Sequence, residues 1–282
     1  MPGTLFVVAT PIGNLEDITT RALRVLRQVR LIAAEDTRRT ARLLARYAIN
    51  TPTTSFHQHN ESRKLTALVE RLQRGEDVAL VSDAGTPTIS DPGQHLVRAA
   101  ISAGIRVEPI PGPSALLAAL AGSGLGGSTF TFLGFPPTRS QDRRKWFEQL
   151  RTAGPIVVFF EAPHRLRATL QHVQDAFGDC QVAVAREVTK VHEEFVRGPI
   201  SLILEHFLKP IGEFTIVMDL GHQTEQGANL VPATGELLRQ FCQMTERERL
   251  SRRSAIGKLA RAHGMRTNEV YRAIEKARKS VM

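Results

Sequence analysis

The sequence predicts a protein of the α/β class, made of two α/β domains followed by a small basic helical domain. Three observations support this prediction. Short apolar segments alternate with amphipathic segments through residues 1–121, which is typical of a parallel sheet with crossover helices. Residues 122–222 carry more strand-like segments for each helix, which indicates a mixed sheet. Residues 223–282 are basic and have a helical pattern, so we expect three domains with these limits.

The first domain is expected to contain five short strands separated by helices. Apolar runs and shorter extended segments predict strands at 5–10, 31–35, 53–56, 78–82 and 106–110. The segments between them place apolar side chains at helical spacing, as Leu65, Leu68 and Leu72 do. They predict helices at 18–28, 37–47, 61–74, 93–103 and from residue 114 onward. The glycine cluster at 121–128 predicts a hinge to the second domain.

The second domain has a different rhythm, with several strands for each helix. We expect strands at 130–135, 154–161, 180–189, 193–198 and 212–220, and helices near 143–150, 166–177 and 201–208. A polar, glycine-containing linker follows at 221–229. Two further helices are expected at 252–263 and 267–279, with the spacing of a helix-turn-helix, although such a two-helix pattern is common.

The net charge of +9 is concentrated in the last part of the chain. Residues 230–282 contain 12 basic and 5 acidic side chains, a net charge of +7, whereas residues 1–229 have a net charge of only +2. A basic appendage on a nearly neutral body favours a polyanionic partner, and a solvated helical surface is the alternative. The 2 cysteines have neither disulfide nor metal spacing. We expect a cytoplasmic protein, because neither a secretory signal nor a membrane-spanning apolar stretch is evident.

Four loops carry the candidate chemistry, and each follows a predicted strand. They are ATPIGN (9–14), SDAGTP (82–87), PGPSA (111–115) and FFEAPHR (159–165). Because ligands of open α/β sheets bind at the carboxyl ends of strands, these loops are expected to line one crevice. No loop has the glycine pattern of a dinucleotide or phosphate cradle, so the ligand need not be bound through phosphates.

Several long motifs, taken in order, carry a family resemblance. They are LFVVATPIGNLEDIT, AAEDTR, SDAGTPTISDPG, PGPSA, FFEAPHR and GEFTIVM. From about residue 5 to residue 220 the chain resembles the bacterial rRNA ribose methyltransferases of the RsmI type. These belong to the tetrapyrrole (corrin/porphyrin) methylase superfamily, and the basic tail resembles the small helical domain that such enzymes append.

The resemblance implies S-adenosylmethionine (SAM) as cofactor, bound in a cleft between the two α/β domains. It also implies methylation of the ribose 2′-oxygen of a cytidine in the decoding centre of 16S rRNA, by a homodimer. Carried onto this sequence, the cofactor-binding residues are Pro11, Asp83, Ala84, Gly85, Thr86, Ser114, Ala115 and Phe160. Asp83 suits the amino group or ribose of SAM, although an aspartate there is also an ordinary cap of a strand end.

Transfer of a methyl group to a hydroxyl oxygen needs in-line positioning and removal of the hydroxyl proton. Candidate catalytic residues are Glu161, Glu187 and Lys190. Candidate RNA contacts are Arg38, Arg165, Arg252, Arg253, Lys258, Arg261 and Arg272. Salt bridges between domains are the alternative role for these charges in the body of the chain. His57 and His59 lack an evident third ligand nearby, so no metal site is expected.

Two other functions remain open from the sequence. The first is a small-molecule methylase of the same superfamily that acts on a tetrapyrrole, which the charge of the tail disfavours. The second is a non-catalytic RNA-binding protein that has lost SAM. The three intact loops ATPIGN, SDAGTP and PGPSA argue against the latter, because a cleft without a cofactor has no chemical need for them.

Overall fold

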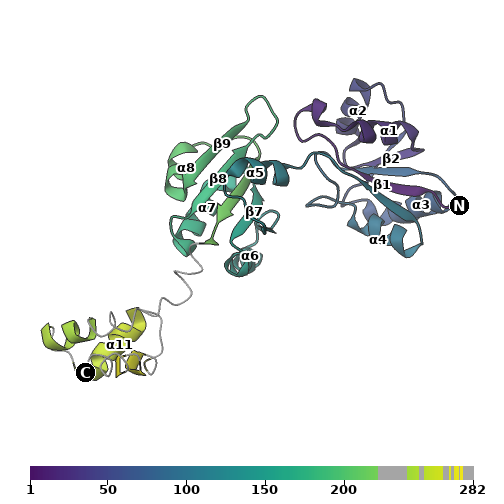
Figure 1. Ribbon diagram of the computed structural model, residues 1–282. Helices are drawn as coiled ribbons and strands as arrows, with labels where there is room; N and C mark the ends of the chain where they lie inside the picture. Colours follow the sequence, from purple (N-terminus) through teal and green to yellow (C-terminus); the bar gives the residue numbers. More distant parts are fainter. Residues whose placement is uncertain (222–239, 248–250, 263–266, 268–269, 273, 276–282) are drawn as a thin grey trace. The chain divides into compact units, whose positions relative to one another are not determined.

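The computed structural model describes residues 1–221, 240–247, 251–262, 267, 270–272 and 274–275, and it is shown in Figure 1. The chain forms two compact units, Met1–Asp219 and Leu220–Met282. The first unit contains two five-stranded sheets.

The first sheet is parallel throughout, with the strand order β3-β2-β4-β1-β5. Its strands are β1 (Thr4–Val8), β2 (Leu31–Ala34), β3 (Thr53–Ser55), β4 (Val78–Val81) and β5 (Arg106–Ile110). Every residue of β2 and β4 is buried, as the apolar runs predict for central strands covered on both faces. The predicted alternation of parallel strands and helices is confirmed in this half.

Two pairs of helices cover the two faces of this sheet (Figure 1). The helices α1 (Thr20–Gln28) and α2 (Thr37–Arg46) pack on one face through Leu26 and Leu43, after a short 3-10 turn at Leu15–Asp17. On the other face, α3 (Glu61–Gln73) and α4 (Gln94–Ser102) bury a second apolar cluster. All strands therefore end at the same edge of the sheet, where the loops gather.

The second sheet is mixed, with the order β6-β7-β10-β8-β9. Only β6 and β7 are parallel, and the other neighbours in this sheet are antiparallel. Its strands are β6 (Thr131–Phe132), β7 (Ile156–Glu161), β8 (Gln181–Arg186), β9 (Glu194–Pro199) and β10 (Phe214–Asp219). The accompanying helices are α5 (Ala115–Ser123), α6 (Ser140–Thr152), α7 (Pro163–Phe177) and α8 (Ile200–His206).

The helix α5 follows the last strand of the first sheet but packs on the second sheet. Ala119 is fully buried against Val158, Ala183 and Val217. The chain thus passes from one sheet to the other ahead of α5, in the PGPSA loop, and the predicted hinge at 121–128 begins inside the helix. The predicted domain limits remain a prediction.

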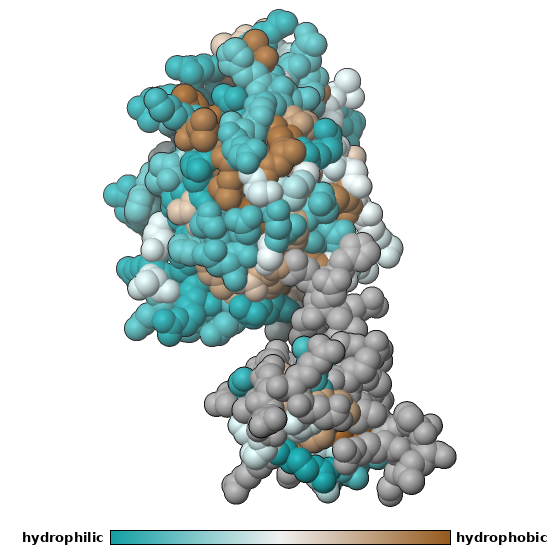
Figure 2. Space-filling view, turned by 90° about the vertical axis from the view of Figure 1, so that its left-hand side faces the viewer, coloured by the Kyte–Doolittle hydropathy of each residue, from teal (hydrophilic) through white to brown (hydrophobic). Residues whose placement is uncertain are grey.

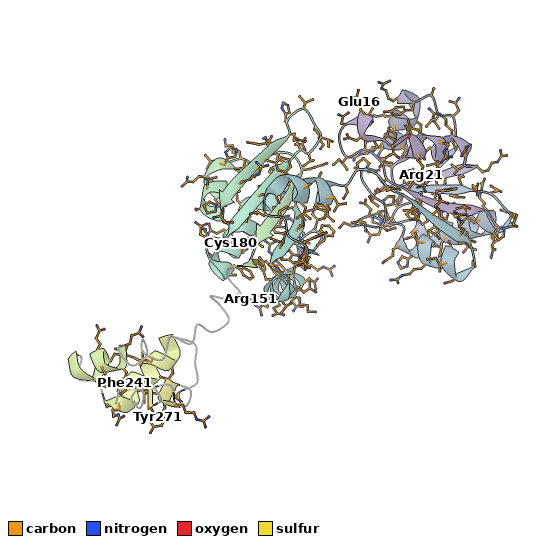
Figure 3. The ribbon with its side chains drawn as sticks, in the orientation of Figure 1. Glu16, Arg21, Arg151, Cys180, Phe241 and Tyr271 are labelled. Carbon is orange, nitrogen blue, oxygen red and sulfur yellow. The ribbon has the colours of Figure 1, made fainter. Side chains whose placement is uncertain are left out.

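The second unit has its own small core, made by Phe241, Ala255, Leu259, Val270 and Ile274. Its described elements are a π-helix at Gln243–Arg247 and the helix α11 at Arg252–Ala262. The second predicted helix, 267–279, is helical at each of its described residues, and most of the linker and the turn at 264–265 lie outside the described residues. Phe241 and Tyr271 mark this unit in Figure 3.

The face of the molecule in Figure 2 is mainly hydrophilic, with separate hydrophobic groups among polar ones. The exposed large hydrophobic side chains include Leu202, Leu208 and Ile211. None of the described helices is both long and apolar enough to cross a lipid bilayer. Trp146, on α6, is 4% exposed and donates its ring N–H to the carbonyl of Leu133.

Candidate functional site

A cavity of about 810 Å³ lies at the carboxyl ends of the first sheet and is also lined by residues of the second sheet. Its volume is in the range of pockets that bind cofactors and other small molecules. The first sheet contributes β5 and the loops after β1, β2, β4 and β5. The second half contributes α5, β7, β10 and neighbouring loops. The lining includes Ile12, Glu35, Asp83–Thr86, Ile89–Asp91, Pro109–Gly112, Ser114–Leu117, Phe135, Phe160–Pro163, Val188 and Gly212–Thr215.

Backbone hydrogen bonds join two of the predicted loops, ATPIGN and SDAGTP, beside the cavity. Thr10 donates its N–H to the carbonyl of Gly85 at 2.8 Å, and Gly85 donates back to Thr10 at 3.0 Å. Gly85 has φ +79°, a left-handed conformation that favours glycine. In the same loop, Thr88 (φ 74°) and Ser90 (φ 64°) are held in this region despite their side chains. Such strain at a cavity is typical of a binding loop.

The carboxylates of Glu35, Asp83 and Asp91 lie on one side of the cavity, in the loops after the neighbouring strands β2 and β4. Asp83 accepts the N–H of Asp36 at 2.9 Å, while its own N–H donates to Glu35 at 3.2 Å. Asp83 also lies 3.4 Å from the guanidinium of Arg39. Burial, together with the negative charges of Glu35 and Asp83, raises the pKa of Asp91 from 3.8 to about 6, although a hydrogen bond with Ser82 opposes the shift.

All ionisable side chains in the described lining of the cavity are acidic. Among the residues that line the cavity in the described part of the chain, the ionisable side chains are Glu35, Asp83, Asp91, Glu161 and Glu213, with no lysine, arginine or histidine. Asp83, Glu161 and Glu213 pair with Arg39, Arg165 and Lys190 outside the lining. Glu35 and Asp91 have no such partner among the described residues, so the pocket favours a cationic ligand over a phosphate.

An aromatic group forms the wall contributed by the second sheet. The ring of Phe160 lies 5.0 Å from that of Phe132 and 5.3 Å from that of Phe135. Phe135 is 52% exposed and Leu117 is 54% exposed, although both line the cavity. Such apolar surface, open to solvent inside a cavity, is suited to cover a flat ring system such as a base.

Glu161 ends β7 and is 1% exposed. Its carboxylate accepts the N–H of Ala162 at 2.8 Å and the hydroxyl of Thr169 at 2.5 Å, and it pairs with Arg165 at 2.6 Å. The Nε of Arg165 is buried without a hydrogen-bond partner in the described structure. Glu161 is therefore a well-oriented carboxylate whose observed contacts are structural.

Glu187 and Lys190 are not part of the cavity lining, although their neighbours Val188 and Glu213 are. Lys190 contacts Glu187 at 2.9 Å and Glu213 at 3.0 Å. Burial opposes the charge of both partners, but the hydrogen bonds between them outweigh it, so the pKa of Glu187 is lowered and that of Lys190 is raised. The intervening Thr189 accepts the N–H of Asn14 at 3.1 Å, which ties this loop to the ATPIGN loop of the other half.

The residues predicted to bind the cofactor largely come together. Those found in the lining are Asp83, Ala84, Gly85, Thr86, Ser114, Ala115 and Phe160. Pro11 is not part of the lining, although its neighbour Ile12 is. The lining also contains Asp91, Phe135 and the segment Gly212–Thr215, which are not among the predicted cofactor-binding residues. Asp91 was predictable from the sequence, because it lies in the same motif as Asp83, SDAGTPTISDPG.

The residues predicted to contact RNA fall in separate places. Arg38 has a side chain that is 89% exposed and pairs with Asp36, whose pKa its hydrogen bond lowers to about 2. The side chain of Arg165 is 18% exposed. In the second unit, Arg252, Lys258 and Arg272 are exposed. Arg253 and Arg261 belong to α11, but their side chains lie outside the described ones.

The described residues contain no group of three or more His, Cys, Asp or Glu able to hold a metal ion.

The fold and this cavity define the class of protein. Residues 4–203 match the family described as Tetrapyrrole (Corrin/Porphyrin) Methylases. The chain belongs to this family.

The names of curated relatives are more specific than the description of the family. The chain is 50% identical over 218 residues to "Ribosomal RNA small subunit methyltransferase I" of Thermotoga maritima, covering 77% of this chain and 98% of the relative. It is 43% identical over 283 residues to the protein of the same name in Pseudomonas aeruginosa, covering 99% of both. Among solved structures, uroporphyrin-III C-methyltransferase from Thermus thermophilus, complexed with S-adenosylhomocysteine, matches with a TM-score of 0.55 at 17% identity, covering 78% of this chain and 99% of that one.

Proposed function

We propose that this protein is a SAM-dependent methyltransferase that methylates the ribose 2′-oxygen of a cytidine in the decoding centre of 16S rRNA. The observation that carries the proposal is the cavity at the carboxyl edge of the first sheet, which favours a cation, in a chain of the methylase family. The shared name of the relatives, of which the Pseudomonas aeruginosa protein matches over 99% of the chain, supports ribosomal RNA of the small subunit as the substrate.

The residues of the cavity fit SAM. SAM carries a sulfonium and an ammonium, and the carboxylates Glu35, Asp83 and Asp91 supply opposite charge. Its own carboxylate suits the N-terminus of α5, where Ser114 caps the helix. The aromatic wall around Phe160 suits the adenine. When bound, SAM supplies a methyl group activated for transfer to a nucleophilic oxygen.

The ribose hydroxyl must lose a proton during transfer, and an acceptor with a pKa near the working pH is best suited to take it. Glu161, Glu187 and Lys190 are the candidates from the sequence, and Glu161 is the one among them that lines the cavity. Asp91 is an additional candidate, because it lines the cavity and has a pKa of about 6. The proposal includes a homodimer that works on the small ribosomal subunit or its RNA, in the cytoplasm.

A direct assay tests the proposal against the tetrapyrrole alternative. The purified protein is incubated with SAM labelled in the methyl group, and with either small ribosomal subunits from cells lacking the protein or uroporphyrinogen. We expect label in 16S rRNA, recovered as a 2′-O-methylated cytidine. Label in the tetrapyrrole alone would overturn the proposal, and label in neither would favour a non-catalytic role.

A further inference from the structure

The first half of the molecule carries a concentration of positive charge that its overall balance conceals. Residues 18–47 contain eight arginines and two acidic side chains, a net charge of +6. The rest of residues 1–229 has 17 basic and 21 acidic side chains, a net charge of −4. All eight arginines are exposed, and they are Arg21, Arg24, Arg27, Arg30, Arg38, Arg39, Arg42 and Arg46. We call these residues the arginine face.

The helices that carry the arginine face pack side by side on one face of the first sheet (Figure 1). Arg27, on α1, donates to the carbonyl of Tyr47, directly after α2, at 3.1 Å. The hydroxyl of Tyr47 in turn donates to the carbonyl of Leu15, ahead of α1, at 2.6 Å. Arg21, labelled in Figure 3, marks the α1 side of this surface. The seven arginines of α1 and α2 therefore belong to one surface, and Arg30 follows the end of α1.

Much of this charge is not neutralised within the molecule. Arg21, Arg38 and Arg39 pair with acidic side chains. For Arg24 and Arg42, no ion pair or hydrogen bond of the side chain is found in the described part of the chain. Neither helix contains an acidic residue. Repulsion among these charges costs stability, which points to an external anion.

The opposite face of the same sheet shows that this charge is not a general property of the domain. The helices α3 and α4 together contain 4 basic and 2 acidic side chains, whereas α1 and α2 contain 7 arginines and no acidic side chain. Arg63, on α3, and Arg98, on α4, are exposed. The helices on the two faces of one sheet thus differ in net charge.

The arginine face begins at the cavity. Arg38 and Arg39 follow Glu35 at the start of α2, and Arg39 pairs with Asp83, which lines the cavity. Arg38, Arg42 and Arg46 succeed one another at intervals of four residues, which places them in one row along the helix with steps of about 6 Å. This row starts beside a cavity whose ionisable lining side chains are all carboxylates.

We propose that the arginine face of α1 and α2 binds the phosphate backbone of the substrate RNA beside the target nucleotide. This inference rests on the proposed function. A nucleotide that enters the cavity brings flanking phosphates with it, and the acidic lining repels them. The arginine face holds them outside the cavity, and it does so without reading bases, because contacts to phosphate fix position rather than sequence.

The test removes two charges that have no internal role. In R24Q/R42Q, both side chains are exposed, so the fold is expected to remain intact. The matched control is R63Q/R98Q on the opposite face. For each variant, affinity for small ribosomal subunits from cells lacking the protein is measured against salt concentration. SAM affinity is measured by calorimetry, and the melting temperature is recorded.

We expect R24Q/R42Q to bind the subunits at least tenfold more weakly at low salt, with a salt slope smaller by about 1.4 to 1.8, because each lost phosphate contact removes about 0.7 to 0.9. SAM affinity should match that of the control, and the melting temperature should be no lower, because the substitutions relieve repulsion. An unchanged slope, with the unaltered protein binding normally, would overturn the inference alone. If the unaltered protein neither binds nor methylates the subunits, the proposed function fails and the inference with it.

Discussion

Replacement of Asp91 by asparagine is predicted to stabilise the protein at neutral and alkaline pH. Burial and the charges of Glu35 and Asp83 raise the pKa of Asp91 from 3.8 to about 6. Above pH 6 the folded protein carries an ionised carboxylate in an unfavourable place, whereas the unfolded chain ionises it freely. Asparagine has nearly the same shape, retains a side-chain oxygen for Ser82, and has no charge.

The magnitude follows from the two pKa values. A difference of about two units corresponds to at most about 3 kcal/mol in the free energy of unfolding. Below pH 4, Asp91 is protonated in both the folded and the unfolded protein, so its ionisation does not lower the free energy of unfolding. As the pH rises from 4 through 6, the unfolded protein loses this proton first and the free energy of unfolding falls. The stability of D91N relative to the unaltered protein should therefore rise between pH 4 and pH 7 and remain constant above.

Urea unfolding, followed by circular dichroism at pH 4, 6 and 8, measures this difference. D142N, which changes an exposed aspartate in the first turn of α6, serves as the control, and its difference from the unaltered protein should be small at each pH. A D91N difference that does not vary with pH, or a D91N protein less stable than the unaltered one at pH 8, would refute the reasoning.

Three further predictions concern the cofactor, the tail and the second domain. Asp83→Ala should weaken SAM binding at least tenfold in calorimetry, since it removes a cavity carboxylate and the acceptor of the Asp36 N–H; unchanged affinity would exclude Asp83 from the site. Removal of residues 230–282 should weaken rRNA binding and lower its salt dependence while SAM affinity stays the same, and an unaltered salt slope would contradict a role of the tail. Glu161→Ala should reduce the free energy of unfolding by about 3 to 5 kcal/mol, because it leaves the guanidinium of Arg165 without its partner; a loss below about 1 kcal/mol in denaturant unfolding would show that the pair contributes little.

Much of the fold was predictable because the sequence patterns are local. The buried strands β2 and β4 are continuous apolar runs, and α1 and α2 have a clear apolar stripe. The packing of α5 was not predictable. Its sequence, ALLAALAGS, is apolar on all sides, so nothing in it distinguishes the first sheet from the second. Tertiary contacts alone decide that question.

The candidate site was predictable where it follows the end of a strand, as at Asp83 and Ser114. The segment Gly212–Thr215 was missed because its place depends on the strand order, in which β10 lies between β7 and β8. Of the arginine face, only Arg38 was predicted to contact RNA. A net charge of +2 over residues 1–229 averages the basic surface of α1 and α2 with the acidic remainder, and only the fold separates the two.

The central claim is that this protein places a methyl group on the ribose of one decoding-centre cytidine. Mapping of 2′-O-methylation along 16S rRNA, from cells with and without the protein, tests it most directly. The account predicts that one cytidine in the decoding centre loses its methyl group, and that the purified protein with SAM restores it. Identical methylation at every 2′-oxygen in the two samples would contradict the account.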